Sequence, residues 1–325
     1  MEAKATPTIL VTGALGQVGS ELVPALRERF GLSRVVASDV RALPAEHPIR
    51  GGPFEILDCT DRSRLEAVVG EQGIGTIYHL AAILSAKAEA QPELAWRVNM
   101  EGLHHVLEVA RTYGCRVFVP SSIAAFGPST PKDPTPQDTL QRPHSLYGVT
   151  KVAGELLCDY YAHRFGLDVR GLRYPGLISY TAPPGGGTTD YAVEIFWEAL
   201  RQGSYTCFLG PDTRLPMMYM PDAIRATLEL MEADLAGLRH RNAFNVTAFS
   251  CTPALLAAEI KKHLPHFKIH YQIDPVRQAI ADSWPHTLDD AAAREEWGWK
   301  PAFDLAAMTA DMLEQLSARL AVKGA

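Results

Sequence analysis

Tyr147 and Lys151 stand four residues apart in the stretch SLYGVTKVAGE (residues 145–155), which otherwise has a helical pattern. A helix turns once every ~3.6 residues, so the phenol and the ammonium group point from one face. Such a pair could act as a general base. The unperturbed tyrosine pKa of about 10 is too high for the phenol to take a proton at neutral pH, and a nearby cation lowers this pKa because it stabilises the phenolate. The spacing is also common on solvated helix surfaces, so other residues must decide.

Two serines stand at the end of an apolar segment, RVFVPSS, a short distance before Tyr147. A serine hydroxyl can orient the oxygen of a secondary alcohol while a tyrosine takes its proton and a hydride leaves for a nicotinamide cofactor. Ser121 and Ser122, with Tyr147 and Lys151, therefore favour alcohol oxidation in which Lys151 lowers the pKa of Tyr147.

A glycine loop points to the cofactor. The stretch ILVTGALGQVGSEL places Gly13, Gly16 and Gly19 between a strand pattern and a helix pattern, where a backbone can approach a pyrophosphate at a helix N-terminus. Asp39 ends the next strand, where its carboxylate would accept the adenosine ribose hydroxyls and repel a 2′-phosphate. We therefore predict NAD, although Arg41 could accommodate that phosphate.

Further candidates follow the next strands. Asp58 ends the third strand and is placed to meet the adenine amino group, and small residues such as Ala81 and Ala82 end the fourth. Ligands of open parallel sheets bind beyond the carboxyl ends of the strands, which is where these residues fall.

The elements that must position these groups alternate along the chain. Alternation of short apolar strands with helices predicts an α/β fold, a Rossmann-like doubly wound parallel sheet covered on both faces. We expect residues 1–175 to form the NAD-binding core and 176–325 mainly a smaller C-terminal α/β substrate-binding lobe, with some segments returning to the core. The predicted core strands are 8–12, 34–39, 54–58, 76–82, 116–122 and 168–175, and the predicted core helices are 16–30, 61–73, 92–114 and the helix containing Tyr147.

The second half begins with a Pro/Gly-rich loop, TAPPGGGTTDYA. Its glycines 185–187 predict a flap that closes over a small polar substrate and excludes water. Helical patterns resume directly, at 190–202, 221–233, 252–264 and 304–320, with weaker strand patterns near 205–209, 243–247 and 268–272.

Composition excludes several classes of protein. The chain has 325 residues, 47% hydrophobic and 21% charged, with a net charge of −6. Without a basic tract, a long apolar run or a leader-like N-terminus, we expect neither nucleic-acid nor membrane binding. The five scattered cysteines lack a C-x-x-C pair, which fits reduced thiols in the cytoplasm and predicts no metal site.

Over residues 8–178 the chain resembles the extended branch of the short-chain dehydrogenase/reductase superfamily. The matching features, in order, are the glycine triplet, Asp39, Asn99, the serine pair and Tyr147-x-x-x-Lys151. The resemblance implies that Ser122, Tyr147, Lys151 and Asn99 are catalytic, with Asn99 kinking its helix and holding a water in a proton relay. It also implies a homodimer formed through the helices that contain Asn99 and Tyr147. The branch includes nucleotide-sugar epimerases and dehydratases, so the fold alone does not select the reaction.

Four segments narrow the resemblance to the short-chain L-threonine 3-dehydrogenases: AAILSAKAE, RYPGLISYTAPPGGGTTDYAVEIF, LPMMYMPDAIRATLELM and IADSWPHTLDDAAAREEWGW. This resemblance implies NAD-dependent oxidation of the L-threonine 3-hydroxyl to 2-amino-3-oxobutanoate, a step of threonine catabolism. The implied substrate-binding residues are Ser85, Ser122, Tyr147, Gly187, Thr188, Thr189 and Trp284. The predicted cofactor-binding residues are Gly13, Gly16, Gln17, Val18, Gly19, Asp39, Arg41, Asp58, Cys59, Leu80, Ala81, Ala82, Asn99, Ser121, Tyr147, Lys151, Tyr174 and Leu177.

Two other functions stay open. A nucleotide-sugar epimerase or dehydratase would need basic groups for a diphosphate, and Arg173 and Arg214 are candidates. A non-catalytic NAD-sensing protein is the third possibility, but such proteins typically lose the serine, tyrosine or lysine that this chain retains. Taken singly, Ser85, the two threonines and Trp284 could also be loop, capping or packing residues.

Overall fold

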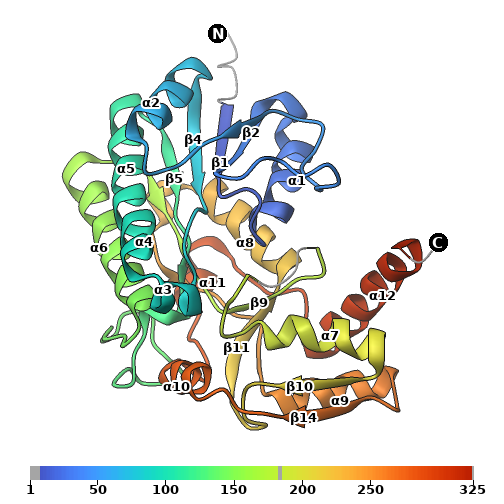
Figure 1. Ribbon diagram of the computed structural model, residues 1–325. Coiled ribbons are helices and arrows are strands. Elements are labelled where there is room, and N and C mark those ends of the chain that lie inside the picture. Colours follow the sequence, from blue (N-terminus) through green and yellow to red (C-terminus); the bar gives the residue numbers. More distant parts are fainter. Residues whose placement is uncertain (1–7, 182–184, 324–325) are drawn as a thin grey trace.

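The computed structural model describes residues 8–181 and 185–323, so the middle of the predicted Pro/Gly-rich loop (182–184) lies outside the described residues. The centre of the molecule is a six-stranded sheet in which all neighbouring strands are parallel (Figure 1). The strand order is β3 (Phe54–Ile56), β2 (Val35–Asp39), β1 (Thr8–Thr12), β4 (Ile74–His79), β5 (Arg116–Phe118) and β7 (Val169–Arg170). This order reverses between β1 and β4, as in Rossmann folds, so the predicted fold class is confirmed.

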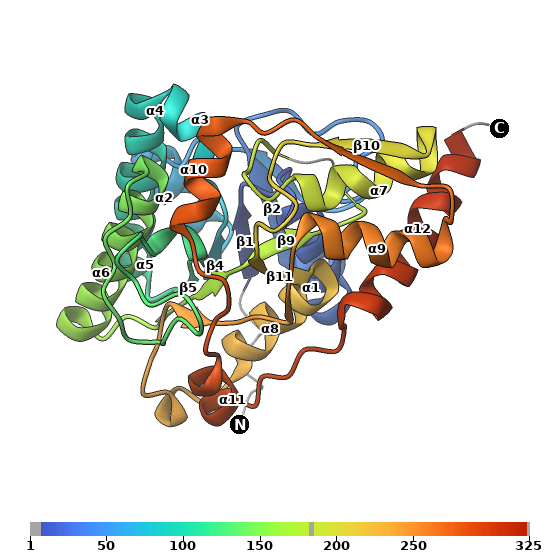
Figure 2. The same ribbon diagram turned by 90° about the horizontal axis from the view of Figure 1, so that it is seen from below.

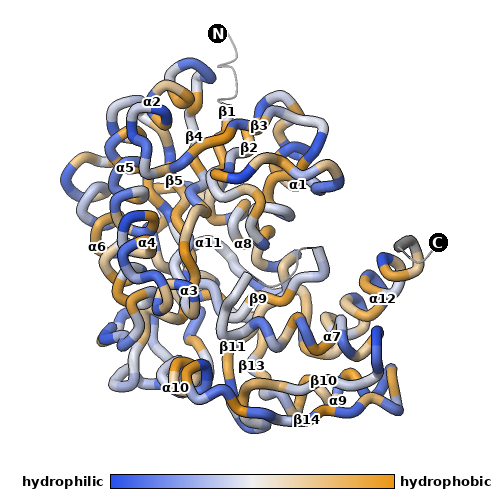
Figure 3. Tube along the Cα trace, in the orientation of Figure 1, coloured by the Kyte–Doolittle hydropathy of each residue, from blue (hydrophilic) through white to orange (hydrophobic). Residues whose placement is uncertain are grey.

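Helices cover both faces of this sheet, and β1 shows why. Ile9 and Val11 point into the cluster shared with α1 and α8, whereas Leu10 points into the cluster shared with α2, α5 and α6. Successive residues of a strand face opposite sides, so a strand buried on both faces reads as a continuous apolar run. Figures 1 and 2 show the two layers of helices, and Figure 3 shows the hydrophobic central strands between them. The helices are α1 (Gly19–Phe30), α2 (Arg62–Glu71), α5 (Gly102–Tyr113), α6 (Leu146–Phe165) and α8 (Met220–Glu232).

Two of the predicted strands are each broken into two. Segment 116–122 divides into β5 and β6 (Ser121–Ser122) at Pro120, which has no N–H for a ladder hydrogen bond. Segment 168–175 divides at Gly171 into β7 and β8 (Leu172–Tyr174), where a Cβ on Gly171 would lie 2.3 Å from the Val119 carbonyl oxygen. With β12 (Phe244–Asn245), β6 and β8 form a separate three-stranded sheet.

The predicted helix 92–114 is also interrupted. It consists of α4 (Pro92–Trp96), a π-helical turn (Arg97–Glu101) and α5, and it is preceded by the short helix α3 (Ser85–Ala90). An extra residue in one turn bends a helix and is often found at functional sites. The turn contains Asn99, the residue expected to kink this helix.

The second half of the chain adds two small sheets. One contains β9 (Gly176–Ile178), β11 (Leu215–Tyr219) and β13 (Phe249–Cys251), and the other pairs β10 (Ser204–Cys207) with β14 (Lys268–Tyr271). Strands β9, β11 and β13 were not predicted: β9 and β13 have three residues each, and β11, which is buried along its whole length, shows no alternation of apolar and polar residues. The surrounding helices are α7 (Tyr191–Gln202), α9 (Pro253–His263), α10 (Pro275–Ser283), α11 (Ala291–Trp297) and α12 (Leu305–Lys323).

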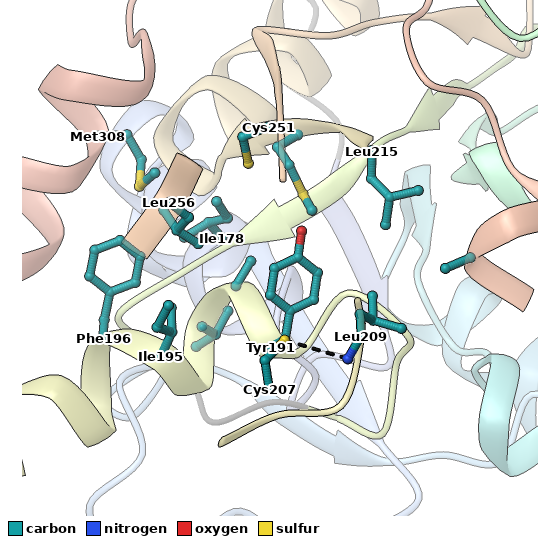
Figure 4. Packing of buried hydrophobic residues seen from close by; sticks show 14 of the residues in the cluster. Ile178, Tyr191, Ile195, Phe196, Cys207, Leu209, Leu215, Cys251, Leu256 and Met308 are labelled. Atoms are coloured by element: carbon teal, nitrogen blue, oxygen red, sulfur yellow. Dashed lines mark hydrogen bonds between the residues drawn. The ribbon is translucent and has the colours of Figure 1, made fainter. Parts of the chain in front are cut away.

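Side chains of α7, α9 and α12 meet these strands in a dry cluster (Figure 4). Tyr191, Phe196, Leu256 and Met308 are all fully buried there. The cluster fixes the start of α7 and so the loop that precedes it. Within the described ranges, no helix is long and apolar enough to cross a bilayer.

Candidate active site

A cavity of about 750 Å³ runs along the carboxyl ends of the central strands and into the second half of the chain. Every predicted site residue except Asn99 lines it. Asn99 lines a smaller cavity of about 30 Å³ that shares Leu80, Ser121 and Lys151 with the large one. The residues brought together in the large cavity are Gly13, Gly16, Gln17, Val18, Gly19, Asp39, Arg41, Asp58, Cys59, Leu80, Ala81, Ala82, Ser85, Ser121, Ser122, Tyr147, Lys151, Tyr174, Leu177, Gly187, Thr188, Thr189 and Trp284.

The glycine loop forms one end of this cavity, at the N-terminus of α1. Gly13 has φ +68°, and a Cβ there would lie 2.6 Å from the backbone nitrogen of Ala81, so only glycine fits between the loop and the end of β4. A Cβ on Gly19 would meet Ala14 at 2.6 Å. The buried Gln17 Nε2 has no hydrogen-bond partner among the described residues. A tight backbone, a helix N-terminus and a donor without a partner suit the diphosphate of a dinucleotide.

Two residues with opposite predicted effects on cofactor selection form an ion pair: Asp39, which favours NAD, and Arg41, which could accommodate the 2′-phosphate of NADP. Asp39 Oδ1 accepts hydrogen bonds from Arg41 N at 3.1 Å and Arg41 Nε at 2.9 Å, and Oδ2 accepts from the Leu15 N–H at 3.1 Å. This hydrogen bonding raises the pKa of Arg41. Ribose hydroxyls would have to share the carboxylate with the guanidinium, which is largely exposed.

We expect Asp39→Ala to weaken NAD binding about tenfold or more, because it removes a charged acceptor for the ribose hydroxyls. The affinity for NADP should fall less than the affinity for NAD, because Arg41, released from Asp39, can approach the 2′-phosphate. Titration of each dinucleotide by protein fluorescence measures both dissociation constants. Asp58→Ala, which removes another carboxylate of the same cavity, is the control, and an unchanged ratio of NAD to NADP affinity in Asp39→Ala would refute the assignment.

Asp58 and Cys59 line the part of the cavity that we predict to hold the adenine. Asp58 lies two residues beyond the end of β3, is exposed, and accepts hydrogen bonds from Thr60 N at 2.9 Å and Thr60 Oγ1 at 2.8 Å. Cys59 is buried against α5, where a Cβ on Gly102 would lie 2.6 Å from its sulfur. Burial raises the pKa of Cys59 to about 12, so it is a neutral thiol at neutral pH.

Ser122, Tyr147 and Lys151 converge from two elements. Ser122 ends β6, and Tyr147 is in the first turn of α6, whose N-cap Ser145 accepts the Gly148 N–H at 3.1 Å. The Ser122 hydroxyl hydrogen-bonds to the phenol of Tyr147. Lys151 Nζ lies 5.4 Å from the centroid of the Tyr147 ring and donates to the Pro120 carbonyl at 2.7 Å. The i, i+4 spacing thus places the base and its cation on one face.

Burial acts on the pKa of both Tyr147 and Lys151. Burial raises it to about 12, and the hydrogen bond from Ser122 only partly opposes this effect. Burial also lowers the pKa of Lys151 to about 8, against the charge of Glu155. The pKa of Tyr147 is thus above its ordinary value in this structure, because desolvation of the phenol is the largest effect on it. The lowering by Lys151 together with a bound nicotinamide stays a prediction.

The Asn99 side chain forms hydrogen bonds that link the chain after β4 to α6. Its Oδ1 accepts the Ile83 N–H at 2.8 Å, and its Nδ2 donates to the Ile83 carbonyl and to Thr150 Oγ1, each at 3.1 Å. Thr150 Oγ1 in turn donates to the Tyr147 carbonyl at 2.8 Å. These contacts tie the chain after β4 to the first turns of α6. Within the described residues, the Asn99 amide thus holds the tyrosine helix in place.

The opposite end of the cavity is small and polar. Ser85 Oγ, at the start of α3, lies 3.4 Å from Thr188 Oγ1, and both residues are buried. Asp190 Oδ2 accepts the N–H groups of Gly186 at 2.8 Å and Gly187 at 2.7 Å, which shapes the loop before α7. Thr189 and Trp284 complete this wall. The structure thus pairs Thr188 rather than Thr189 with Ser85.

Several lining residues were not predicted. Lys87 lies in the AAILSAKAE segment, where only the serine was singled out, and Asp190 follows the two threonines directly. Arg97 begins the π-helical turn. A charged residue in an exposed helical segment carries no sequence signal of its own, so only the cavity identifies these three.

The arginines proposed for a diphosphate are placed elsewhere, which corrects that expectation. Arg173 is buried in an ion pair with Glu155 at 2.9 Å, with side-chain exposures of 8% and 5%. Arg214 pairs with Asp133 at 3.3 Å on the surface. Neither arginine lines the cavity. Among the described residues, no group of His, Cys, Asp or Glu side chains is arranged to hold a metal ion.

The sequence profile of the NAD dependent epimerase/dehydratase family matches residues 9–247. An uncharacterized epimerase/dehydratase of Staphylococcus haemolyticus is 54% identical over 308 residues, which cover 95% of this chain and 97% of that protein. The crystal structure of L-threonine dehydrogenase from Clostridium difficile is 53% identical, with a TM-score of 0.95, over 97% of this chain and 99% of that one. A monomeric L-threonine 3-dehydrogenase from a metagenome is 49% identical, with a TM-score of 0.92, over 96% and 99%.

Proposed function

The chain belongs to the NAD dependent epimerase/dehydratase family, and we propose that it oxidises the 3-hydroxyl of L-threonine with NAD, giving 2-amino-3-oxobutanoate. The small polar wall formed by Ser85 and Thr188, in the same cavity as Tyr147, is the observation that carries this proposal. The near full-length likeness to solved L-threonine dehydrogenases supports it. All five cysteines are free and buried, which supports a cytoplasmic location. A role in threonine catabolism follows from the proposed reaction.

The reaction needs a base for the hydroxyl proton and an acceptor for the hydride. NAD, when bound, supplies the hydride acceptor and a positive charge near the phenol. Tyr147, as phenolate, takes the proton of the 3-hydroxyl while the C3–H bond breaks, so that C3 becomes a ketone. Ser122 hydrogen-bonds to the same oxygen, and Lys151 supports the anionic form of Tyr147 from one turn away. The glycine loop, Gln17 and Asp39 would hold the dinucleotide.

Assay of NADH formation tests the proposal. We expect absorbance of NADH to rise on addition of L-threonine and NAD, and to rise much less with D-threonine, L-allo-threonine or L-serine. An epimerase would retain its NAD tightly and show no net reduction, so a nucleotide sugar is the comparison substrate. Absence of NADH with L-threonine would overturn the proposal, and activity with a nucleotide sugar would favour the second candidate.

We expect kcat/KM to rise with pH above neutrality. The phenolate is the reactive form, and with a pKa held near 12 by burial its population increases about tenfold per pH unit. Lys151→Met should displace the rise to higher pH, because the cation that favours the phenolate is lost. The measurement is kcat/KM for L-threonine from neutrality to about pH 10 in both proteins. A flat wild-type profile would argue against a phenol base.

We also propose a homodimer formed through α4 and α6. Val149, Leu156 and Tyr160, with exposures of 42%, 62% and 53%, recur along one face of α6, and Trp96 on the adjacent α4 is 47% exposed. Leu156→Asp should therefore convert a dimer to a monomer in sedimentation analysis. A monomeric wild type would refute this, and the monomeric metagenome relative makes that outcome informative.

A further inference from the structure

The charged side chains that line the active-site cavity fall into two groups. Those of the first group have partners within the protein: Asp39 with Arg41, Asp58 with Thr60, Asp190 with two glycine N–H groups, and Lys151 with the Pro120 carbonyl. The second group contains two cations, Lys87 and Arg97. Neither forms an ion pair within residues 8–181 and 185–323.

Lys87 belongs to the substrate end of the cavity. Leu84 and Lys87 are three residues apart at the start of α3 and so share a face. Leu84 contacts the glycine loop before α7, because a Cβ on Gly185 would lie 3.3 Å from its Cδ1. Ser85, between them in the chain, reaches Thr188. Lys87, an exposed residue that lines the cavity, is therefore carried by the same segment as Ser85, whose hydroxyl forms part of the polar wall with that of Thr188.

Arg97 is attached to a different part of the cavity. It opens the π-helical turn that leads into Gly102, the residue that packs against Cys59. Cys59 and Asp58 line the part of the cavity predicted to hold the adenine. The two cations without ion pairs are thus carried by segments that lead toward opposite ends of the cavity.

L-Threonine is a zwitterion, and it brings an α-carboxylate as well as an α-ammonium group into this largely apolar-lined cavity. Two hydroxyls can donate hydrogen bonds to the carboxylate, but neither carries a positive charge, and hydrogen bonds from a charged donor are stronger. A lysine on a flexible stem can meet the charge of the carboxylate without a fixed geometry. We propose that Lys87 binds the α-carboxylate of the substrate and makes the site selective for 3-hydroxy amino acids over analogues without the carboxylate charge. This inference rests on the proposed function.

Lys87→Gln tests the inference, because glutamine keeps a polar side chain of similar reach and removes the charge. We expect KM for L-threonine to rise about tenfold, with kcat within about twofold, since the interaction is present in both ground and transition states. KM for L-threoninamide, which keeps the α-ammonium but has no carboxylate charge, should not rise, and the dissociation constant of NAD should be unchanged. Lys87→Arg should restore most of the affinity for L-threonine.

Arg97→Gln is the matched control, because it removes the other cation of the cavity without an ion pair. It should leave KM for L-threonine unchanged. The inference is overturned if Lys87→Gln leaves KM for L-threonine unchanged, raises that for L-threoninamide equally, or weakens NAD instead. It is overturned together with the proposed function if the wild type makes no NADH from L-threonine, so the two failures are distinguishable by the wild-type assay.

Discussion

Replacing Tyr147 by phenylalanine is expected to lower kcat for L-threonine by about 10³-fold, the middle of the range for loss of a positioned general base. The substitution removes one hydroxyl and keeps the ring, which is 8% exposed and packs beside the Lys151 ammonium. Binding of NAD should therefore survive, within about twofold. NADH formation measures turnover, and a fluorescence titration measures NAD affinity on the same preparation.

Tyr160→Phe is the control for this result. Tyr160 lies on the same helix, α6, but is 53% exposed and does not line the cavity. It should turn over like the wild type and unfold at the same temperature. Activity of Tyr147→Phe above about one-hundredth of wild type would leave the base unidentified, since even a modest general base contributes about a hundredfold.

Replacing Arg173 by methionine is expected to lower the free energy of unfolding by about 3–5 kcal/mol, because it leaves a buried carboxylate without its cation. Arg173 Nη2 and Nε bind the two Glu155 oxygens at 2.9 and 3.0 Å. Ser121 and Gln141 also donate to Glu155, but neither carries a charge. Equilibrium denaturation by urea, monitored by circular dichroism, gives the loss.

Two variants identify the cause of that loss. Arg214→Met breaks the ion pair between Arg214 and Asp133, whose side chains are 47% and 51% exposed. It should lower the free energy of unfolding by less than about 1 kcal/mol. The double variant Glu155→Leu with Arg173→Met removes both buried charges and should recover much of the stability, since apolar replacement of a buried pair is often neutral. A loss in Arg173→Met no larger than in Arg214→Met would contradict the role of burial.

The pair also matters to the active site. Glu155 is one helical turn beyond Lys151, and its charge opposes the effect of burial on the lysine pKa. Because α6 carries Tyr147, Lys151 and Glu155 on one face, the ion pair with Arg173 anchors the helix of the proposed base to β8. A weakened anchor is expected to affect turnover as well as stability.

The sequence by itself determined the features whose physics is local. A glycine turn before a helix, an acid at the end of a strand and an i, i+4 pair each depend on a few consecutive residues, so Gly13, Asp39, Tyr147 and Lys151 could be identified without coordinates. Unbroken apolar runs such as 8–12 show that a strand is buried on both faces.

Only the tertiary structure decided which distant groups meet and how deeply they are buried. Ser85 contacts Thr188, which is 103 positions away in the chain, and Arg173 forms an ion pair with Glu155 and does not line the cavity. The pKa of Tyr147 depends on the packing around its hydroxyl, because burial disfavours the phenolate more than the hydrogen bond of Ser122 favours it. Such contacts and burial arise from segments far apart in the chain, so no spacing within one segment encodes them.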